Sequence, residues 1–265
     1  MMINEDDVVT VERKEIQSEI KIGCCSFVGT RTKQQDRIFY NMKDELLLAA
    51  VCDGMGGMES GEIASQAVVD MLGDDFKNLC NNSNFPDFLR QEAIRADWIV
   101  NKLQDEAGNT VKSGTTIVSV LIQQNNFYWM SVGDSKIYFF RNGKMLAVTR
   151  EHNYKLSLDI LKRRGEISEL QYKAEVSKGQ ALISYIGMGN ISLIDGNSEA
   201  FHLESGDRIL LCSDGLYKNL REDEMLSIVQ KYRNAQEVAE ALIMCVEKKK
   251  KKNQDNTSVV VINFK

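Results

Sequence analysis

The order of strand-like and helix-like segments constrains the fold of this chain more than any other feature. Short strand-like runs fall at 19–28, 37–42, 45–52, 115–123, 127–132, 136–140, 144–148, 181–185, 191–194, 208–212 and 258–264. Helix-like stretches form two groups, 61–79 with 85–107 and 222–231 with 235–248. Because strands and helices do not alternate one by one, the pattern predicts packed β-sheets with helices outside rather than βαβ units.

The chain is expected to form one domain. Its 265 residues suffice for one substantial core, and it has a single proline and no repeat or low-complexity linker. We expect residues 1–15, which are rich in acidic side chains, to be a mobile tail and residues 16–265 to be the domain. Residues 154–180 are charged and are interrupted by Gly165 and Gly179, so they predict short helices and loop.

Composition excludes several classes of function. The formal net charge of −5 argues against a general nucleic-acid surface, which needs a basic footprint. No apolar run approaches the length of a membrane span, and the first residues lack the pattern of a signal peptide. We therefore expect a cytoplasmic protein with no nucleic-acid partner and no membrane span.

Cysteine and histidine do not form a zinc-binding pattern. The six cysteines include no CxxC pair, and we expect them to be reduced thiols. The two histidines, His152 and His202, are expected to be structural. Any metal ion would therefore have to be held by oxygen.

Aspartates stand at the ends of five predicted strands. They are Asp53 in AAVCDG, Asp214 in LLCSDG, Asp134 in MSVGDS, Asp255 in QDNTSVVVIN and Asp36 in QQDRIFY. An Asp-Gly pair after a strand often makes only a turn. Five acids at strand ends, however, would repel one another if they met without a cation, and hard oxygen ligands suit magnesium or manganese. The two near-duplicates and three further acids favour a divalent-metal site.

Six segments in order, GTRTKQQD, VCDGMGG, SGTT, VGDSKIYFFRNGKM, RILLCSDGL and DNTSVVVI, resemble the metal-dependent serine/threonine protein phosphatases of type 2C in their compact bacterial form. The resemblance covers roughly residues 20–264, and the ordered combination is specific although each piece alone is weak. It implies an α+β fold with α/β/β/α layers, in which helix pairs flank a central antiparallel β-sandwich. Residues 154–180 match the position of the family's flap beside the active site.

The resemblance implies a metal-binding role for five residues. Asp53 would bridge two Mn²⁺ or Mg²⁺ ions, and Gly54 would bind one of them through its backbone carbonyl. Asp214 and Asp255 would complete the first site, so Asp53, Asp214 and Asp255 are the expected catalytic residues. Asp134 would hold a third, weaker ion together with Asp214. Such a pair of ions activates water for direct attack on phosphorus, so no covalent phosphoenzyme is needed.

Other family positions fit less closely. Arg31 matches the arginine that binds the substrate phosphate, which suits its planar, bidentate guanidinium. Gln35 stands where many members carry Glu, so Gln35 and Asp36 are expected to act at the second metal through water. Met55 stands where eukaryotic members have a histidine proposed to protonate the leaving group, and this role stays unassigned.

The implied function is hydrolysis of phosphoserine and phosphothreonine on proteins, with a serine/threonine kinase as the opposing enzyme and the chain acting as a monomer. One alternative is a pseudophosphatase that keeps the fold as a binding module. Another is a cysteine-dependent phosphatase, because Cys25 and Arg31 fit a C-x5-R spacing, but the following residues predict a strand rather than the required helix. The lysine run 248–252 is expected to be the solvated end of a helix.

Overall fold

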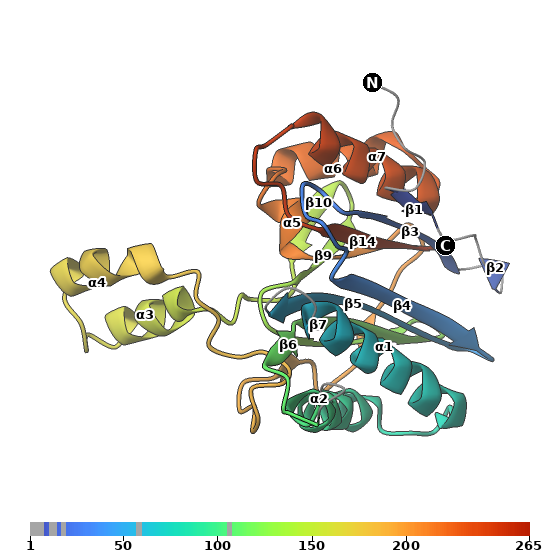
Figure 1. The fold of residues 1–265 in the computed structure, drawn as a ribbon. Coiled ribbons are helices and arrows are strands. Elements are labelled where there is room, and N and C mark those ends of the chain that lie inside the picture. The colour runs from blue at the N-terminus through green and yellow to red at the C-terminus, as the bar shows by residue number, and fades with distance from the viewer. Residues whose placement is uncertain (1–7, 11–14, 17–19, 57–59, 105–107) are drawn as a thin grey trace.

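The computed structural model describes residues 8–10, 15–16, 20–56, 60–104 and 108–265 (Figure 1). Its strands are β1 Val8–Thr10, β2 Glu15–Ile16, β3 Ile20–Phe27, β4 Asp36–Lys43, β5 Leu46–Gly56, β6 Ser113–Thr115, β7 Ile117–Gln123, β8 Asn126–Val132, β9 Lys136–Arg141, β10 Lys144–Ala147, β11 Asp195–Gly196, β12 Phe201–His202, β13 Arg208–Cys212 and β14 Thr257–Phe264. Its helices are α1 Ser60–Asn78, α2 Phe85–Asn101, α3 Tyr154–Arg163, α4 Glu169–Glu175, the short 3₁₀ helix η2 Val176–Lys178, α5 Asp214–Tyr217, α6 Glu222–Lys231 and α7 Ala235–Lys248.

The strands form two antiparallel sheets. The first sheet has the order β1–β3–β14–β13–β9–β10, with β2 also paired to β3. The second sheet has the order β11–β8–β7–β5–β4, with β12 on β8 and β6 on β5. Figure 1 shows α1 and α2 against the outer face of the second sheet and α6 and α7 against the outer face of the first. The predicted α/β/β/α sandwich is therefore confirmed.

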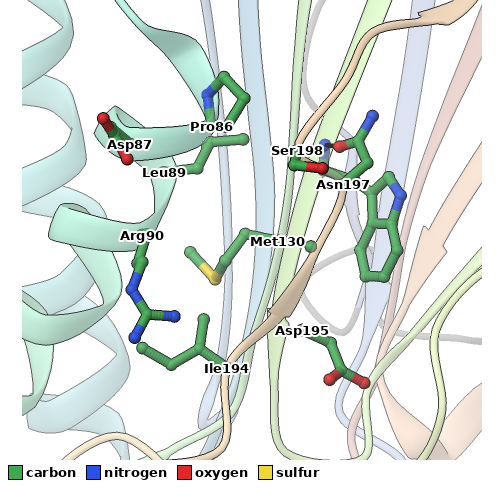
Figure 2. Close-up of a pocket in the computed structure, with 11 residues that line it drawn as sticks. Pro86, Asp87, Leu89, Arg90, Met130, Ile194, Asp195, Asn197 and Ser198 are labelled. Carbon is green, nitrogen blue, oxygen red and sulfur yellow. Dashed lines mark hydrogen bonds between the residues drawn. The ribbon is translucent and has the colours of Figure 1, made fainter.

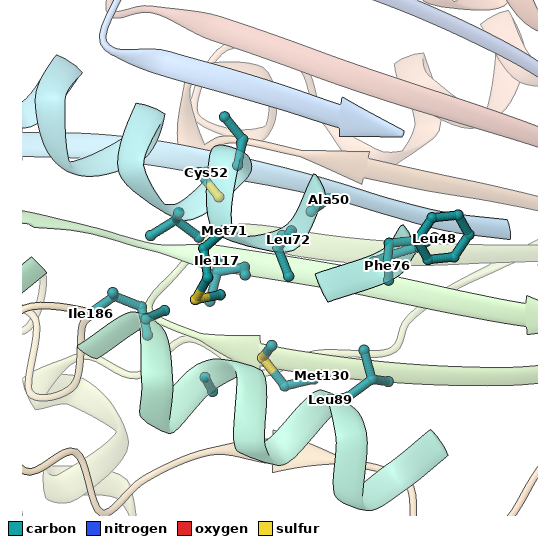
Figure 3. Close-up of a cluster of buried hydrophobic side chains, with 14 of the residues drawn as sticks. Leu48, Ala50, Cys52, Met71, Leu72, Phe76, Leu89, Ile117, Met130 and Ile186 are labelled. Atoms are coloured by element: carbon teal, nitrogen blue, oxygen red, sulfur yellow. The ribbon is translucent and has the colours of Figure 1, made fainter. Parts of the chain in front are cut away.

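Strand β5 shows how the sequence produces these layers. Successive side chains of a strand point to opposite faces, and every side chain from Leu46 to Cys52 is buried. Leu48 and Ala50 pack with α1 and α2 in the cluster drawn in Figure 3, whereas Leu47 and Ala49 pack between the two sheets. A third cluster lies between the first sheet and α5, α6 and α7. One continuous apolar strand thus contributes to two of the three cores.

The predicted helices at 222–231 and 235–248 are confirmed by α6 and α7. The predicted helix at 85–107 ends earlier, at Asn101; residues 105–107 lie outside the described residues. Its start follows local rules, because the Asn84 side chain accepts a hydrogen bond from the backbone N–H of Asp87 and Pro86 lies in the first turn.

Two predicted strands, at 181–185 and 191–194, are wrong. The first forms only a single bridge, between Asn153 and Leu182, and the second has no strand structure. Their apolar side chains are used for packing rather than for a ladder: Ile186, just beyond the first segment, is buried, and Ile191 packs against the cluster under α1 and α2.

Most of the predicted mobile tail lies outside the described residues. Within it, β1 and β2 pair with β3. The predicted helices of residues 154–180 are α3, α4 and η2, which project from the body of the sandwich in Figure 1.

Candidate active site

Asp36 of β4 and Asp53 of β5 lie side by side in the second sheet, because the two strands pair and these residues stand directly opposite each other. Asp53 does not end its strand, as the sequence suggested, since β5 continues to Gly56. At Asp53 the strand leaves β7 and begins to pair with β6. Thr116 fixes this point: its N–H donates to the Asp53 carbonyl at 2.9 Å, and its hydroxyl accepts from the Asp53 N–H at 3.1 Å.

Asp214 and Asp255 come from the first sheet. Asp214 begins α5 immediately after β13, and Asp255 lies two residues before β14, which pairs with β13. A side chain on Gly215 would overlap the Asn256 carbonyl, so glycine allows the start of α5 to pack against the backbone beside Asp255.

Ser213 joins the two sheets at the same end of the sandwich. Its hydroxyl donates to Asp36 Oδ2 at 2.8 Å and accepts from the Ser258 N–H at 2.9 Å. Ser213 therefore brings Asp36 of the second sheet next to the start of α5 and β14, where Asp214 and Asp255 lie.

The pKa shifts of Asp53 and Asp36 also indicate that the acids of the two sheets lie near one another. Burial raises the pKa of Asp53 well above its usual range, and the charges of Asp36, Asp214, Asp134 and Asp255 raise it further. Burial likewise raises the pKa of Asp36 to about 7, although hydrogen bonds from Ser213 and Ser258 oppose the shift. We call Asp36, Asp53, Asp134, Asp214 and Asp255 the carboxylate cluster.

Two cationic side chains partly neutralise the carboxylate cluster. Arg31, in the loop between β3 and β4, donates from Nη2 to Asp255 Oδ2 at 2.8 Å and is 57% exposed. Lys218, at the end of α5, contacts Asp214 Oδ2 and lies 4.0 Å from Asp134 Oδ2. In the part of the chain that the structure describes, no three acidic, thiol or imidazole groups are already gathered as a set of metal ligands.

The carboxylate cluster nevertheless fits divalent cations. Its donors are oxygens, the type that magnesium and manganese prefer. Asp36 Oδ1 is buried and has no hydrogen-bond partner among the described residues. The mutual repulsion that raises the pKa of Asp53 is the kind that a bound cation would relieve.

Gly54 has a packing role that the sequence did not reveal. A Cβ at this position would lie 2.2 Å from the Gly61 carbonyl oxygen and 2.6 Å from that of Gln35. Glycine therefore lets the first turn of α1 lie directly on β5. Gln35 is held through its backbone, since its N–H donates to Asn256 Oδ1 at 2.8 Å and its carbonyl accepts from Ser65 Oγ at 2.6 Å.

Lys218 and Ser213 are among the side chains at the carboxylate cluster that sequence reasoning missed. Lys218 follows Asp214 by four residues, a spacing that brings two side chains together on a helix, so SDGLYK contained a usable signal. For Ser213 no local signal exists, because its partner Asp36 is 177 residues away.

The structure argues against a nucleophilic Cys25. This residue is 1% exposed and packs within the cluster between the first sheet and α5, α6 and α7. Burial raises the pKa of its thiol to about 12, so a reactive thiolate is not available at neutral pH.

The two histidines lie outside the carboxylate cluster. His152 is buried; its Nδ1 accepts from the Gly133 N–H at 3.2 Å and its Nε2 lies 3.1 Å from Asp195 Oδ2. His202 Nε2 lies 2.7 Å from Asn125 Nδ2 at the surface.

One cavity contains no predicted site residue, and another lies next to the carboxylate cluster. One of about 210 Å³ lies between α2 and β11, and its labelled residues in Figure 2 include Arg90 and Asp195 but no predicted site residue. The other, of about 290 Å³, includes Met55 beside the cluster, together with Tyr185 and Met188.

Among the described residues, no helix is long and apolar enough to cross a membrane.

Comparisons with known proteins concern the family and the fold. The family model described as Protein phosphatase 2C matches residues 28–252. A serine/threonine phosphatase stp from Listeria welshimeri is 27% identical over 228 residues, which cover 85% of this chain and 87% of that protein.

Solved structures share the fold. The structure of the S. agalactiae serine/threonine phosphatase superposes with a TM-score of 0.76 at 25% identity, and the match covers 93% of this chain and 100% of that one. The catalytic domain of the phosphatase PstP in complex with two manganese ions superposes with a TM-score of 0.69 at 25% identity, covering 93% of this chain and 98% of its own.

Proposed function

Because the chain belongs to the protein phosphatase 2C family, we propose that it removes phosphate from phosphoserine and phosphothreonine in proteins by means of two divalent cations bound at the carboxylate cluster. The observation that carries this proposal is the meeting of acids from both sides of the sandwich at Asp53, whose pKa is raised by burial and by the charges of these neighbours. A cluster of this charge is unfavourable by itself and is explained by the binding of cations.

The proposed ligands are Asp53, Gly54, Asp214 and Asp255, with Mn²⁺ or Mg²⁺ as the ions. Asp53 is proposed as the ligand shared by both ions, and its electrostatic coupling to Asp214 and Asp255, which adjoin strands of the other sheet, supports this role. Two such cations would supply a nucleophile from water at neutral pH and offset charge on the phosphoryl oxygens. Gln35 and Asp36 are proposed to act from outside this set, through water.

Arg31 is proposed to bind the substrate phosphate. Its guanidinium is more than half exposed and points to the carboxylate cluster through Asp255. The planar fork offers further donors for a phosphate. Binding of a cation by Asp255 would release the Arg31 Nη2 donor that Asp255 now holds, so cation and phosphate binding would support each other.

Buried hydroxyl groups hold members of the carboxylate cluster in position. Ser213 ties Asp36 to the first sheet, and Thr116 fixes the backbone of Asp53. The Thr116 hydroxyl also lies 2.7 Å from Ser135 Oγ, next to Asp134. Such support reduces the motion of a catalytic group and is what a site of this kind requires.

The proposal extends to the biological setting. Phosphoproteins would be the substrates, an opposing serine/threonine kinase would supply the phosphate, and the chain would act in the cytoplasm as a monomer built on residues 16–265. The hairpin of α3 and α4 would correspond to the family's flap and influence substrate choice.

The test is phosphate release from a phosphothreonine peptide by chelator-treated protein, with manganese added back, in the presence and absence of an alkylating agent. We expect activity that requires manganese and survives alkylation. Activity without any divalent ion, or its loss on alkylation, would reject the two-cation proposal. Inactivity with both manganese and magnesium would favour the pseudophosphatase.

A further inference from the structure

The side chain of Lys218 lies between two members of the carboxylate cluster that come from different elements. Asp214 begins α5, and Asp134 lies in the turn between β8 and β9. The Lys218 ammonium contacts Asp214 Oδ2 and lies 4.0 Å from Asp134 Oδ2. Both carboxylates are shielded from solvent, with side chains 14% and 8% exposed.

Several contacts hold this arrangement in place. The Lys218 N–H donates to the Asp214 carbonyl at 3.0 Å, and the Lys218 carbonyl accepts from Lys251 Nζ at 2.8 Å. Tyr217 OH donates to the Asp134 carbonyl at 3.0 Å, which ties the turn to α5. The backbone of Lys218 and the two elements that carry its carboxylate partners are therefore tied to one another.

Charge favours a protonated Lys218 at this position. Burial lowers the pKa of its ammonium, but the charges of Asp214, Asp134 and Asp53 outweigh burial and raise the pKa above its usual value. Burial and the charge of Asp214 raise the pKa of Asp134 to about 6, although the charge of Lys218 opposes this shift. One fixed positive charge thus serves two carboxylates.

We propose that the Lys218 ammonium occupies the place between Asp134 and Asp214 that a third divalent cation would otherwise take, so that this chain binds two ions rather than three. The proposal rests on the proposed two-cation function. A third ion would first have to displace the Lys218 ammonium from Asp214 and would then lie beside that ammonium. Both steps are unfavourable because like charges repel. Lys218 would supply a constant positive charge that does not depend on the concentration of free metal.

Lys218→Met tests the proposal, because methionine keeps an unbranched side chain and removes the charge. Calorimetric titration of chelator-treated protein with manganese measures the number of ions bound without reference to activity. We expect two ions for the unmodified protein and a third, weaker binding event for Lys218→Met. The double variant Lys218→Met with Asp134→Asn should return to two, since one carboxylate of the pair is then lost.

Two lysine variants serve as controls. Lys218→Arg keeps the charge and should stay at two ions. Lys249→Met removes a lysine of similar exposure, 34% against 44%, that pairs with Glu224 at 2.6 Å and lies outside the carboxylate cluster. It should also stay at two ions, which excludes a general effect of lowered positive charge.

The outcomes separate the two proposals. Three ions bound to the unmodified protein would overturn the role of Lys218 while leaving the two-cation site in place. Two ions in a folded Lys218→Met variant would also overturn it. If Lys218→Met fails to fold, Lys218→Gln and the count for the unmodified protein decide the question. Absence of manganese binding by the unmodified protein would reject both proposals.

Discussion

Asp53 is the residue at which burial and four neighbouring carboxylates together oppose ionisation. We predict that Asp53→Asn lowers phosphate release more than ~100-fold, beyond the loss seen when only a supporting partner of a metal ligand is removed. The same change should raise the thermal stability of the metal-free protein at neutral pH, because a repelled negative charge disappears while the shape of the side chain is kept. Activity assays and thermal unfolding in chelator measure the two effects.

The sign of the stability effect depends on pH. An aspartate in an unfolded chain has a pKa of about 3.9, and the folded protein raises it, so ionisation destabilises the fold at higher pH. The stabilisation by Asp53→Asn should therefore vanish at about pH 4 and below. Asp70→Asn on the exposed face of α1 is the control and should change neither activity nor this pH dependence. A metal-free Asp53→Asn protein that is less stable than the unmodified one at neutral pH would contradict the prediction.

Asp36 gives a second pH dependence. Burial raises its pKa to about 7, so its protonated form stabilises the metal-free protein fully below about pH 4, and this contribution is lost as the pH rises through about 7. Unfolding temperatures measured in chelator should fall between about pH 5 and pH 8, and Asp36→Asn should flatten that fall. Stability that rises steadily over the same interval would show that ionisation of Asp36 does not destabilise the folded protein.

At the scale of single residues, the sequence predicted which residues belong to the site better than it predicted the contacts of those residues. The aspartates were found because each stands next to an apolar run, and such a run indicates a strand from neighbouring residues alone. Ser213 and Thr116 were not found, since their partners Asp36 and Asp53 come close only when the two sheets and β5 are assembled.

Loop 187–191 is an element that sequence patterns did not predict. The Asp97 carboxylate on α2 accepts hydrogen bonds from the backbone N–H groups of Gly187, Gly189, Asn190 and Ile191 at 2.7 to 3.3 Å. The positive φ angles of Gly187, Gly189 and Asn190 allow the backbone to wrap around this acid. The predicted strand at 191–194 begins at Ile191, whose N–H bonds to this distant side chain rather than to a neighbouring strand.

We predict that Asp97→Ala destabilises the protein by about 2–4 kcal/mol, because it leaves several backbone donors without their charged acceptor. Hydrogen exchange should become faster in residues 187–191 while the sheets stay protected. Asp87→Asn, an exposed acid in the first turn of α2, is the matched control and should have a small effect. Unchanged exchange in the loop would mean that its conformation does not depend on Asp97.

The hairpin of α3 and α4 should be separable from the body of the protein. It projects from the sandwich in Figure 1, and Leu158 in α3 is the one buried residue of α3, α4 and η2. We predict that replacing residues 160–175 with a short glycine–serine linker changes the free energy of unfolding by less than about 1 kcal/mol, since little buried apolar area is lost. Turnover of a small aryl phosphate should remain, whereas kcat/KM for phosphopeptides should change. Loss of turnover with both substrates would place the hairpin in the catalytic machinery itself.

At the scale of the whole molecule, the carboxylate cluster spans the two sheets: Asp36 and Asp53 belong to one, and Asp214 and Asp255 adjoin strands of the other. A cation shared by the two sides would bind the folded chain and not the unfolded one, and should stabilise it by about 2.7 kcal/mol per site at 100 times its Kd. For a chain of this size that corresponds to a rise in Tm of about 5–10 °C. We predict this rise when manganese is added to chelator-treated protein, and its loss in Asp53→Asn.

Calcium is an informative comparison, because its larger radius and flexible coordination suit a compact two-ion site less well. A Tm that does not respond to manganese would mean that the two sheets hold the acids together without any ion, and the repulsion at Asp53 would then have no physical compensation.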